Sequence, residues 1–278
     1  MAKVVDKSEA LKASREDAAK DRQFVSALAR GLEILRAFRP GEIALGNQDL
    51  AERTGLPKAT VSRLTNTLRE LGYLVDHGPT GAYSLGPGVL ALGYAMIAGL
   101  EIRDRARPMM QELARAANAS VALGARDRLS VTYLECCRGE GTVTLSLDVG
   151  SRVPLATSAM GRAIMAALPE RERDYLLRAI RDRQPEEFRR IERGVFDAVD
   201  QLQRQGFVTS FGDWRPDIHA VAAPVLTING QRLYGLNCGG PSFTLSVEEL
   251  TERHGPRVAQ IARDLSVPRE ALGAVLSD

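Results

Sequence analysis

The stretch NQDLAERTGLPKATVSRLTNTLRELG, residues 47–72, determines the fold of the first part of this 278-residue chain. Apolar residues recur at helical spacing on both sides of residues 54–57 (TGLP), where glycine and proline interrupt the pattern. We expect Asn47 to cap the first helix, and Pro57 suits the first turn of the second. Two short helices joined by a turn that contains glycine are typical of a helix-turn-helix motif.

The second of these helices has one apolar face and one polar face. At about 100° per residue, four apolar residues fall on the side that we predict to be buried: Val61, Leu64, Leu68 and Leu71. The opposite side carries Ala59, Ser62, Arg63, Asn66 and Glu70. This amphipathic pattern predicts a helix that packs on one side and presents polar groups on the other.

The exposed face has the chemistry of a helix that reads DNA. An arginine such as Arg63 can contact guanine or phosphate, and an asparagine such as Asn66 can read adenine. The small side chains on this face allow close approach to the major groove. A lysine near the helix N-terminus, together with backbone N–H groups, suits a phosphate. The predicted DNA-contacting residues are Lys58, Ala59, Thr60, Ser62, Arg63 and Asn66.

A β-hairpin is predicted directly behind the helix pair. Residues 73–75 and 83–85 are strand-like, and HGPTG at 77–81 is rich in turn residues. A hairpin in this place is the wing of a winged helix. Its tip holds no lysine or arginine, so we expect it to contribute only modestly to DNA binding. A preceding helix is predicted to end at residues 39–41 and to bury the stripe Val25, Leu28, Leu32, Leu35 and Phe38.

The rest of the chain predicts a mixed α+β domain. Helical patterns at 88–98 and 103–117 lead into alternating, strand-like segments around 121–125, 131–133 and 143–147. Further helices are expected at 157–168, 170–181, 185–205, 246–265 and 268–276, and further strands at 207–211, 219–227 and 232–238, with a turn at 228–231. The predicted boundaries are a charged arm at 1–22, a winged helix-turn-helix domain at 23–86, a linker helix at 87–100 and a second domain at 101–278.

Composition limits the possible classes of protein. Hydrophobic residues make up 44% and charged residues 26%, which is ordinary for a globular protein, and a net charge of +2 does not by itself argue for nucleic-acid binding. The most apolar stretch, 89–100, is too short to span a bilayer, and the charged N-terminus has no signal-peptide core. We therefore expect a cytoplasmic protein without a membrane partner.

The sequence gives little support to an enzyme or a metal site. It lacks a glycine-rich phosphate loop and the GxSxG and HExxH motifs, so we expect neither catalysis nor a cofactor. A zinc site from Asp213, His219 and Cys238 is conceivable, although the spacing matches no zinc signature. The adjacent Cys136 and Cys137 are either a redox sensor or, more commonly for such a pair, buried packing.

Several segments resemble the IclR family of bacterial regulators. They are ARGLEIL at 29–35, LAERTGLPKATVSRL at 50–64, LGYL at 71–74, YSLG at 83–86, VPLATSAMGRA at 153–163, AAPV at 222–225 and GGP at 239–241. The resemblance covers nearly the whole chain from about residue 24. It implies a winged helix joined by a linker helix to a GAF-like (profilin-like) effector-binding domain, and dimers often paired into tetramers. It also implies control of operons for catabolism, stress or secondary metabolism by small carboxylates, including aromatic acids.

The resemblance also implies the residues of an effector pocket. They are Leu145, Val153, Leu155, Ser158, Ala159, Met160, Ser210, Asp213, Ile218, Ala220, Asn237 and Gly239. In support, residues 157–161 open a predicted helix, whose N-terminus attracts carboxylates, and Asn237 is a polar residue in a strand pattern.

The chain departs from the family pattern around this predicted pocket. It has Ala156 and Arg162 where the family usually has histidine and lysine, Asp217 where the family often has glycine, and Ala220 where cysteine or a small residue is common. Trp214, the single tryptophan, either closes over a planar ligand or caps the hydrophobic core.

Together these features predict a ligand-responsive, DNA-binding regulator of a bacterial catabolic operon. Its expected partners are double-stranded operator DNA, a small carboxylate effector, with aromatic acids included in that class, and further copies of itself as a dimer or tetramer. The alternative is a small-molecule sensor whose winged helix mediates protein contacts. The dependence of binding affinity on salt concentration distinguishes these two hypotheses. Binding to DNA weakens steeply as the salt concentration rises, whereas binding through an apolar protein interface does not.

Overall fold

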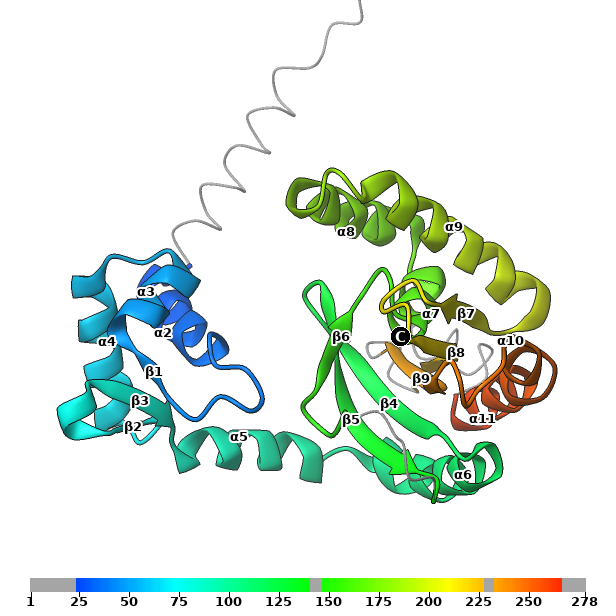
Figure 1. Cartoon of the computed structure of the whole chain (residues 1–278), viewed down its shortest axis with the longest axis horizontal. Helices are drawn as coiled ribbons and strands as arrows, with labels where there is room; N and C mark the ends of the chain where they lie inside the picture. Colours follow the sequence, from blue (N-terminus) through cyan, green and yellow to red (C-terminus); the bar gives the residue numbers. More distant parts are fainter. Residues whose placement is uncertain (1–23, 141–146, 228–232, 267–278) are drawn as a thin grey trace, which may run out of the picture. The chain divides into compact units, whose positions relative to one another are not determined.

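The computed structural model describes residues 24–140, 147–227 and 233–266 (Figure 1). The chain divides into two compact units, and the boundary between them in the sequence falls between Ala98 and Gly99. The predicted arm at 1–22, the turn at 228–231, the helix at 268–276 and the pocket residue Leu145 lie outside the described residues.

The first unit contains the predicted helix pair and wing. Its elements are α2 (Ser26–Arg36), β1 (Leu45–Gly46), α3 (Asn47–Thr54), α4 (Lys58–Glu70), β2 (Leu74–Asp76), a 3-10 turn (Gly78–Thr80), β3 (Ala82–Leu85) and α5 (Pro87–Ala98). The strands form an antiparallel sheet in the order β1-β3-β2, so the wing gains a short third strand that the sequence did not predict.

The turn between α3 and α4 depends on a glycine. Gly55 has a φ of +69°, and its N–H donates to the carbonyl of Ala51 at 2.9 Å. Residues other than glycine rarely adopt this left-handed backbone conformation, so Gly55 permits the sharp change of direction between the helices. A small core then joins the helices to the sheet; its buried residues are Ile34, Leu45, Leu50, Val61, Leu68 and Leu74.

Two sequence predictions about the helix pair are wrong, and one buried residue was missed. Gly46, not Asn47, precedes α3, and its N–H donates to the Asp49 carboxylate at 2.8 Å. Leu71 is 63% exposed although it still follows the helical angle as the C-cap of α4, with its N–H donating to the Thr67 carbonyl at 3.0 Å; it lies at the edge of the apolar stripe, at the end of the helix. In its place Thr65 is buried, with its hydroxyl donating to the Val61 carbonyl at 3.0 Å.

The stripe predicted on the first helix is only partly buried. Val25, Leu28 and Leu32 are exposed, while Ile34, which lies off the predicted stripe, is fully buried. Helical spacing identifies an apolar face but does not say which surface covers it. Helix α5 likewise has no buried residue, and it exposes Leu90, Leu92, Tyr94 and Met96.

The second unit is built on a six-stranded antiparallel sheet in the order β6-β5-β4-β9-β8-β7. The strands are β4 (Ser120–Asp127), β5 (Ser130–Arg138), β6 (Arg152–Pro154), β7 (Val208–Phe211), β8 (Ile218–Leu226) and β9 (Leu233–Pro241). The helices are α6 (Glu101–Ala117), α7 (Ala159–Ala167), α8 (Glu170–Arg183), α9 (Phe188–Gln205), α10 (Val247–Glu249) and α11 (Gly255–Leu265), with a π-helical turn at Leu250–His254. The expected α+β class is therefore confirmed.

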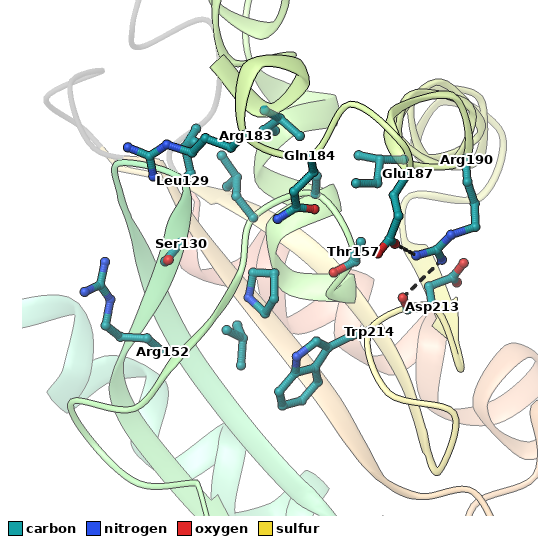
Figure 2. A pocket seen from close by; sticks show the side chains of 16 residues that line it. Leu129, Ser130, Arg152, Thr157, Arg183, Gln184, Glu187, Arg190, Asp213 and Trp214 are labelled. Carbon is teal, nitrogen blue, oxygen red and sulfur yellow. Dashed lines mark hydrogen bonds and ion pairs between the residues drawn. The ribbon is translucent and has the colours of Figure 1, made fainter. Parts of the chain in front are cut away.

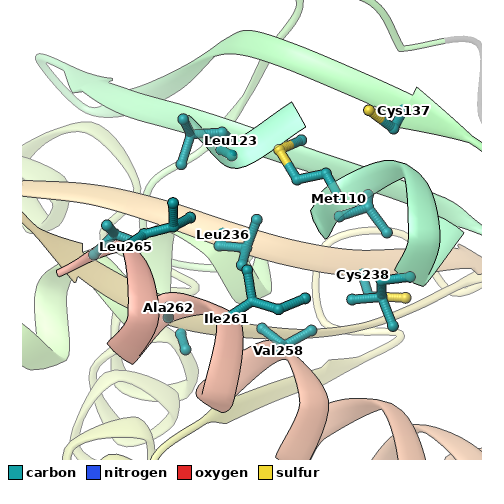
Figure 3. Packing of buried hydrophobic residues seen from close by; sticks show 14 of the residues in the cluster. Met110, Leu123, Cys137, Leu236, Cys238, Val258, Ile261, Ala262 and Leu265 are labelled. Carbon is teal, nitrogen blue, oxygen red and sulfur yellow. The ribbon is translucent and has the colours of Figure 1, made fainter. Parts of the chain in front are cut away.

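Helices cover both faces of this sheet, and each face has its own core. Figure 3 shows the core under α6 and α11, where Met110 and Ile261 pack with Leu236 of β9. The core on the other face is formed with α7, α8 and α9. Helix α7 approaches the sheet closely over Gly235, where an added Cβ would lie 2.5 Å from Cγ of Met160. Glycine at this position therefore allows α7 to lie on the sheet.

Some element boundaries differ from the predictions. Helix α7 begins at Ala159 instead of Thr157, because the Ser158 hydroxyl caps it by accepting the Gly161 N–H at 3.1 Å. Strand β6 at Arg152–Pro154 was not predicted, and the single helix expected at 246–265 is interrupted by the π-helical turn. Within the described ranges, the helices are all too short or too polar to cross a membrane.

Candidate functional site

The polar face of α4 is exposed as predicted. Ala59, Ser62, Arg63, Asn66 and the preceding Lys58 are all exposed, whereas Thr60 is half-buried. Neither the Lys58 nor the Arg63 side chain has an ion-pair or hydrogen-bond partner among the residues that the structure describes. Two cations without an internal partner on one exposed helix face are available for phosphate or for base edges.

Asn66 has an internal partner that the sequence did not predict. Its Oδ1 accepts a hydrogen bond from Nη2 of Arg69 at 2.8 Å. Arg69 also pairs with Glu70 at 2.6 Å and lies 3.6 Å from Asp76 at the end of β2. A bidentate contact with adenine uses both ends of an asparagine amide, so Arg69 would have to release Oδ1 for Asn66 to read that base.

The second unit contains a small inner cavity of about 20 Å³, enough for roughly one water molecule. It brings together eight of the residues predicted for the effector pocket: Val153, Ser158, Ala159, Met160, Ser210, Ile218, Ala220 and Asn237. It adds Tyr133 and Trp214. Tyr133 was missed, although a phenol in the apolar strand pattern around Val131 was a signal for it.

The remaining predicted pocket residues lie elsewhere. Leu155 and Asp213 line a separate, larger cavity next to the inner one. Gly239 lines neither of the two: an added Cβ there would lie 2.6 Å from the Ala220 Cβ, so this glycine allows β8 and β9 to pack closely.

Most polar groups around the inner cavity are already satisfied. The Ser158 hydroxyl donates to the Pro154 carbonyl at 2.6 Å, and the Ser210 hydroxyl donates to the Thr157 carbonyl at 2.8 Å. These bonds hold the loop before α7 against the sheet. They also leave the two hydroxyls with no proton to give to a ligand.

Asn237 is the exception among these polar groups. Its side chain is 7% exposed and hydrogen-bonded to Tyr133, but its Oδ1 has no partner within the described chain. Burial raises the pKa of the Tyr133 phenol above its ordinary value, so the phenol stays protonated at neutral pH. A buried acceptor without a hydrogen bond costs about 1–3 kcal/mol. The inner cavity therefore favours an occupant that donates a hydrogen bond.

The outer cavity is much larger, about 450 Å³, within the range of ligand pockets. It lies between β6, the loop before α7, and helices α8 and α9. Figure 2 shows Arg152 and Arg183 on one side of it and Glu187 and Arg190 on the other. Trp214 and Val153 line both cavities and thus separate them. Trp214 also packs against the core below α7–α9, so it both caps that core and forms a wall of the two cavities.

The arginines of the outer cavity differ in their partners. Arg152 pairs with Asp127 at 3.2 Å, and Arg190 pairs with Glu187 at 2.5 Å and donates to the Asp213 carbonyl at 3.3 Å. Arg183, at the end of α8, has no such partner among the described residues. It is thus a lining cation available to an anionic ligand.

Arg162 lies beside this cavity and is buried. Its guanidinium donates to the Asp213 carboxylate at 2.8 Å, and to the carbonyls of Ala156 and Thr209. Gly194 of α9 makes room for it, because an added Cβ there would lie 2.2 Å from Nη2. The sequence drew attention to Arg162 because the family usually has lysine at this position. It did not predict the ion pair, since Asp213 was expected to contact the ligand directly.

The structure does not support the zinc or redox alternatives. Asp213 pairs with Arg162, and His219 contacts the Leu245 carbonyl through Nδ1 at 3.0 Å. No group of three or more histidine, cysteine or acidic side chains that could hold a metal occurs in the described ranges. Burial raises the pKa of Cys136 to about 11 and that of Cys137 above its ordinary value, so neither thiol is a ready thiolate.

Comparisons with known proteins agree with this architecture. Residues 27–78 match the IclR helix-turn-helix domain, and residues 94–267 match the C-terminal domain of the bacterial transcriptional regulator IclR. The chain is 36% identical over 250 residues to the HTH-type transcriptional regulator TsaQ1/TsaQ2 of Comamonas testosteroni, covering 89% of this chain and 90% of that regulator.

Two solved structures share the fold. An IclR-family regulator from Brucella abortus is 48% identical, with a TM-score of 0.81 over 88% of this chain and 93% of the other. An IclR homologue from Microbacterium hydrocarbonoxydans, solved with 4-hydroxybenzoate, has a TM-score of 0.63 at 20% identity over 89% of this chain and 99% of that one. With family models matched over both units, this protein belongs to the IclR family of bacterial transcriptional regulators, which bind DNA and are not enzymes.

Proposed function

We propose that this protein binds operator DNA through α4 and regulates a bacterial catabolic operon in response to a small carboxylate. The observation that carries this proposal is the exposed face of α4, where Lys58 and Arg63 have no internal partner in the described chain. Arg63 contacts base edges or phosphate in the major groove, and Lys58 contacts phosphate at the helix N-terminus. The neighbouring small residues Ala59 and Ser62 allow the backbone to come close to the bases.

The proposed DNA-binding form is a homodimer. Helices α2 and α5, together with the residue that caps α2, expose seven large apolar side chains within the first unit: Val25, Leu28, Leu32, Leu90, Leu92, Tyr94 and Met96. Exposed apolar residues gathered on two helices are more typical of an interface than of a solvated surface. A two-fold dimer would place two copies of α4 on half-sites about one helical turn apart, and its operator would be close to palindromic.

The proposed effector is a small carboxylate, in keeping with the cavities of the second unit. Arginine side chains line the outer cavity, and Trp214 offers a planar apolar surface beside them. A ligand that binds one conformation of this unit better than another would shift the population of the DNA-binding state. The homologue from M. hydrocarbonoxydans, solved with 4-hydroxybenzoate, is of the same fold and makes an aromatic acid a reasonable first probe.

The test is selection of binding sites from a random duplex library, followed by measurement of the dissociation constant at several salt concentrations. We expect an enriched, near-palindromic site and an affinity that falls steeply with salt, since each phosphate contact adds about 0.9 to the slope. Binding that does not vary with salt, or a library without enrichment, would instead favour the sensor whose winged helix contacts another protein.

A further inference from the structure

The C-terminal end of α4 carries an arginine whose surroundings differ from those of Lys58 and Arg63. The Arg69 guanidinium donates to the Glu70 carboxylate at 2.6 Å and lies 3.6 Å from the Asp76 carboxylate. These two acids offset its positive charge, whereas the side chains of Lys58 and Arg63 have no partner in the described chain. A cation that acids already hold is poorly suited to neutralise a phosphate, so the exposed position of Arg69 points to another role.

A third contact of Arg69 is with a residue of the proposed DNA-reading face. Its Nη2 donates to Oδ1 of Asn66 at 2.8 Å. Residues three positions apart are neighbours on a helix surface, so Arg63, Asn66 and Arg69 form one row along the exposed side of α4. Asn66 is the middle member of this row. Its side chain is therefore held from one end of the row, on the side away from Arg63.

The wing anchors Arg69 in turn. Asp76 is the last residue of β2, and its Oδ1 accepts the N–H of Gly78 at 2.9 Å, which fixes the carboxylate in the turn of the wing. Its other oxygen, Oδ2, is the one that faces Nη1 of Arg69. A guanidinium is planar and its donors have a fixed geometry, so contacts at both of its ends restrict its orientation. A continuous set of contacts thus runs from the wing to the amide of Asn66.

The contact with Arg69 determines which end of the Asn66 amide is free. A guanidinium has donors and no acceptor, so the end of the amide that faces it must be the carbonyl oxygen. The NH2 group of Asn66 has no partner among the described residues. This free end offers two donors and no acceptor. Guanine presents two acceptors in the major groove, N7 and O6, whereas adenine presents one acceptor beside its N6 amino donor.

We propose that Arg69 is a positioning residue that holds Asn66 with its NH2 group free for DNA, so that Asn66 reads guanine. An asparagine without such a neighbour reads adenine, because its oxygen is then available to accept from the N6 amino group. This inference rests on the proposed function, since it requires α4 to lie in the major groove. It makes the base preference at one operator position depend on a residue that contacts no base.

Selection of duplex sites by the full-length protein and by two variants tests this inference. Asn66→Ala identifies the position that Asn66 reads, because the preference for one base is lost there. The parent protein should select guanine at that position in each half-site. Arg69→Met leaves Oδ1 free and should select adenine. Anisotropy titrations of the two matched duplexes should then show the ratio of their dissociation constants changing by at least about tenfold, as expected for a bidentate base contact.

Two further variants separate positioning from a direct phosphate contact. Asp76→Asn retains the oxygen that accepts from the Gly78 N–H but removes the charge facing Arg69, so the preference should shift in the same direction by a smaller factor. Lys58→Met is the matched loss of charge at the other end of α4. It should weaken binding to both duplexes equally and lower the salt slope by about 0.9, whereas Arg69→Met should leave the slope unchanged. All three substituted side chains are exposed, so the variants should fold.

The opposite results would overturn the inference. They are adenine selected by the parent protein, guanine retained by Arg69→Met, a salt slope lowered by about one in Arg69→Met, and a selection profile unchanged in Asn66→Ala. Each of these results is obtained with an operator that the parent protein has already enriched. The proposed function fails only when the parent protein enriches no site or binds without salt dependence, so the two failures are distinguishable.

Discussion

The guanidinium of Arg162 and the carboxylate of Asp213 lie 2.8 Å apart, although 51 positions separate them in the sequence. Arg162 belongs to α7, and Asp213 belongs to the loop between β7 and β8 that also carries Trp214. The Arg162 side chain is 7% exposed, whereas that of Asp213 is 32% exposed. The two partners of this pair therefore face different environments, and losing one is not equivalent to losing the other.

Removal of Asp213 should destabilise the protein more than removal of Arg162. Asp213→Ala leaves a buried guanidinium without its counter-charge, and breaking such a buried pair costs about 3–5 kcal/mol; partial exposure of Asp213 reduces this to about 2–3 kcal/mol. Arg162→Met leaves a carboxylate that water can reach, so its cost should be smaller. Denaturant unfolding of the two variants, compared at one pH, measures the difference. Equal losses, or the reverse order, would contradict the asymmetry.

Substitution of Arg63 by alanine should weaken operator binding. A specific arginine contact to a base contributes about 1–3 kcal/mol, so the dissociation constant should rise roughly 5- to 150-fold. Fluorescence anisotropy with the selected operator measures it. Arg178→Ala removes one positive charge from an exposed site in the other unit, and it controls for the change in net charge. An unchanged affinity in Arg63→Ala would place DNA recognition elsewhere.

The thiol of Cys136 should react slowly in the folded protein. Burial raises its pKa to about 11, so only about one thiol in a thousand is ionised at pH 8, against about one in four for an ordinary cysteine. We expect alkylation by iodoacetamide at this pH to be at least about 100-fold slower than in the unfolded chain, as followed by mass spectrometry. Rapid labelling of the native protein at Cys136 would restore the redox-sensor hypothesis.

Stability should fall in mildly acidic solution because of His254. The imidazole is buried in the π-helical turn, and burial lowers its pKa below the ordinary value of 6.5, an effect that Arg253 reinforces and Glu249 opposes. The unfolded chain therefore binds the proton more readily, so this contribution to stability is complete above pH 6.5 and is lost as the pH falls below it.

A comparison between the parent protein and His254→Gln isolates this effect. The difference in unfolding free energy between about pH 7.5 and pH 5.5 should be smaller in the variant, because the titrating group is gone. Denaturant titrations at the two pH values measure it. An identical pH dependence in both proteins would show that His254 does not contribute.

Local sequence patterns were sufficient to predict most of the helices and strands of the helix-turn-helix unit. The spacing of Val61 and Leu68 places Arg63 and Asn66 on the opposite face, and the structure exposes both. The same spacing gave a wrong prediction for Leu71, which lies at the edge of the apolar stripe at the end of α4 and is exposed. It also missed Thr65, a polar residue that can be buried because its hydroxyl bonds to the preceding turn. Periodicity describes the interior of a helix better than its ends or its partly polar core positions.

The candidate pocket could be predicted only in part. The resemblance to the family located Ser158, Met160 and Asn237, which come together around one cavity. It could not show that Asp213 pairs with Arg162, because that contact depends on the packing of α7 against a loop distant in sequence. Nor could it show two cavities in place of one, since their separation depends on where the Trp214 side chain lies.

The position of Trp214 also has a practical consequence. It is the only tryptophan among the 278 residues, and it forms a wall of both cavities. All indole emission from this protein therefore originates at the boundary between them, close to the guanidinium of Arg215 at 5.8 Å from the ring. The protein contains its own optical reporter of that boundary, and changes in its polarity or in quenching can be followed in the unlabelled molecule while DNA is bound elsewhere on the chain.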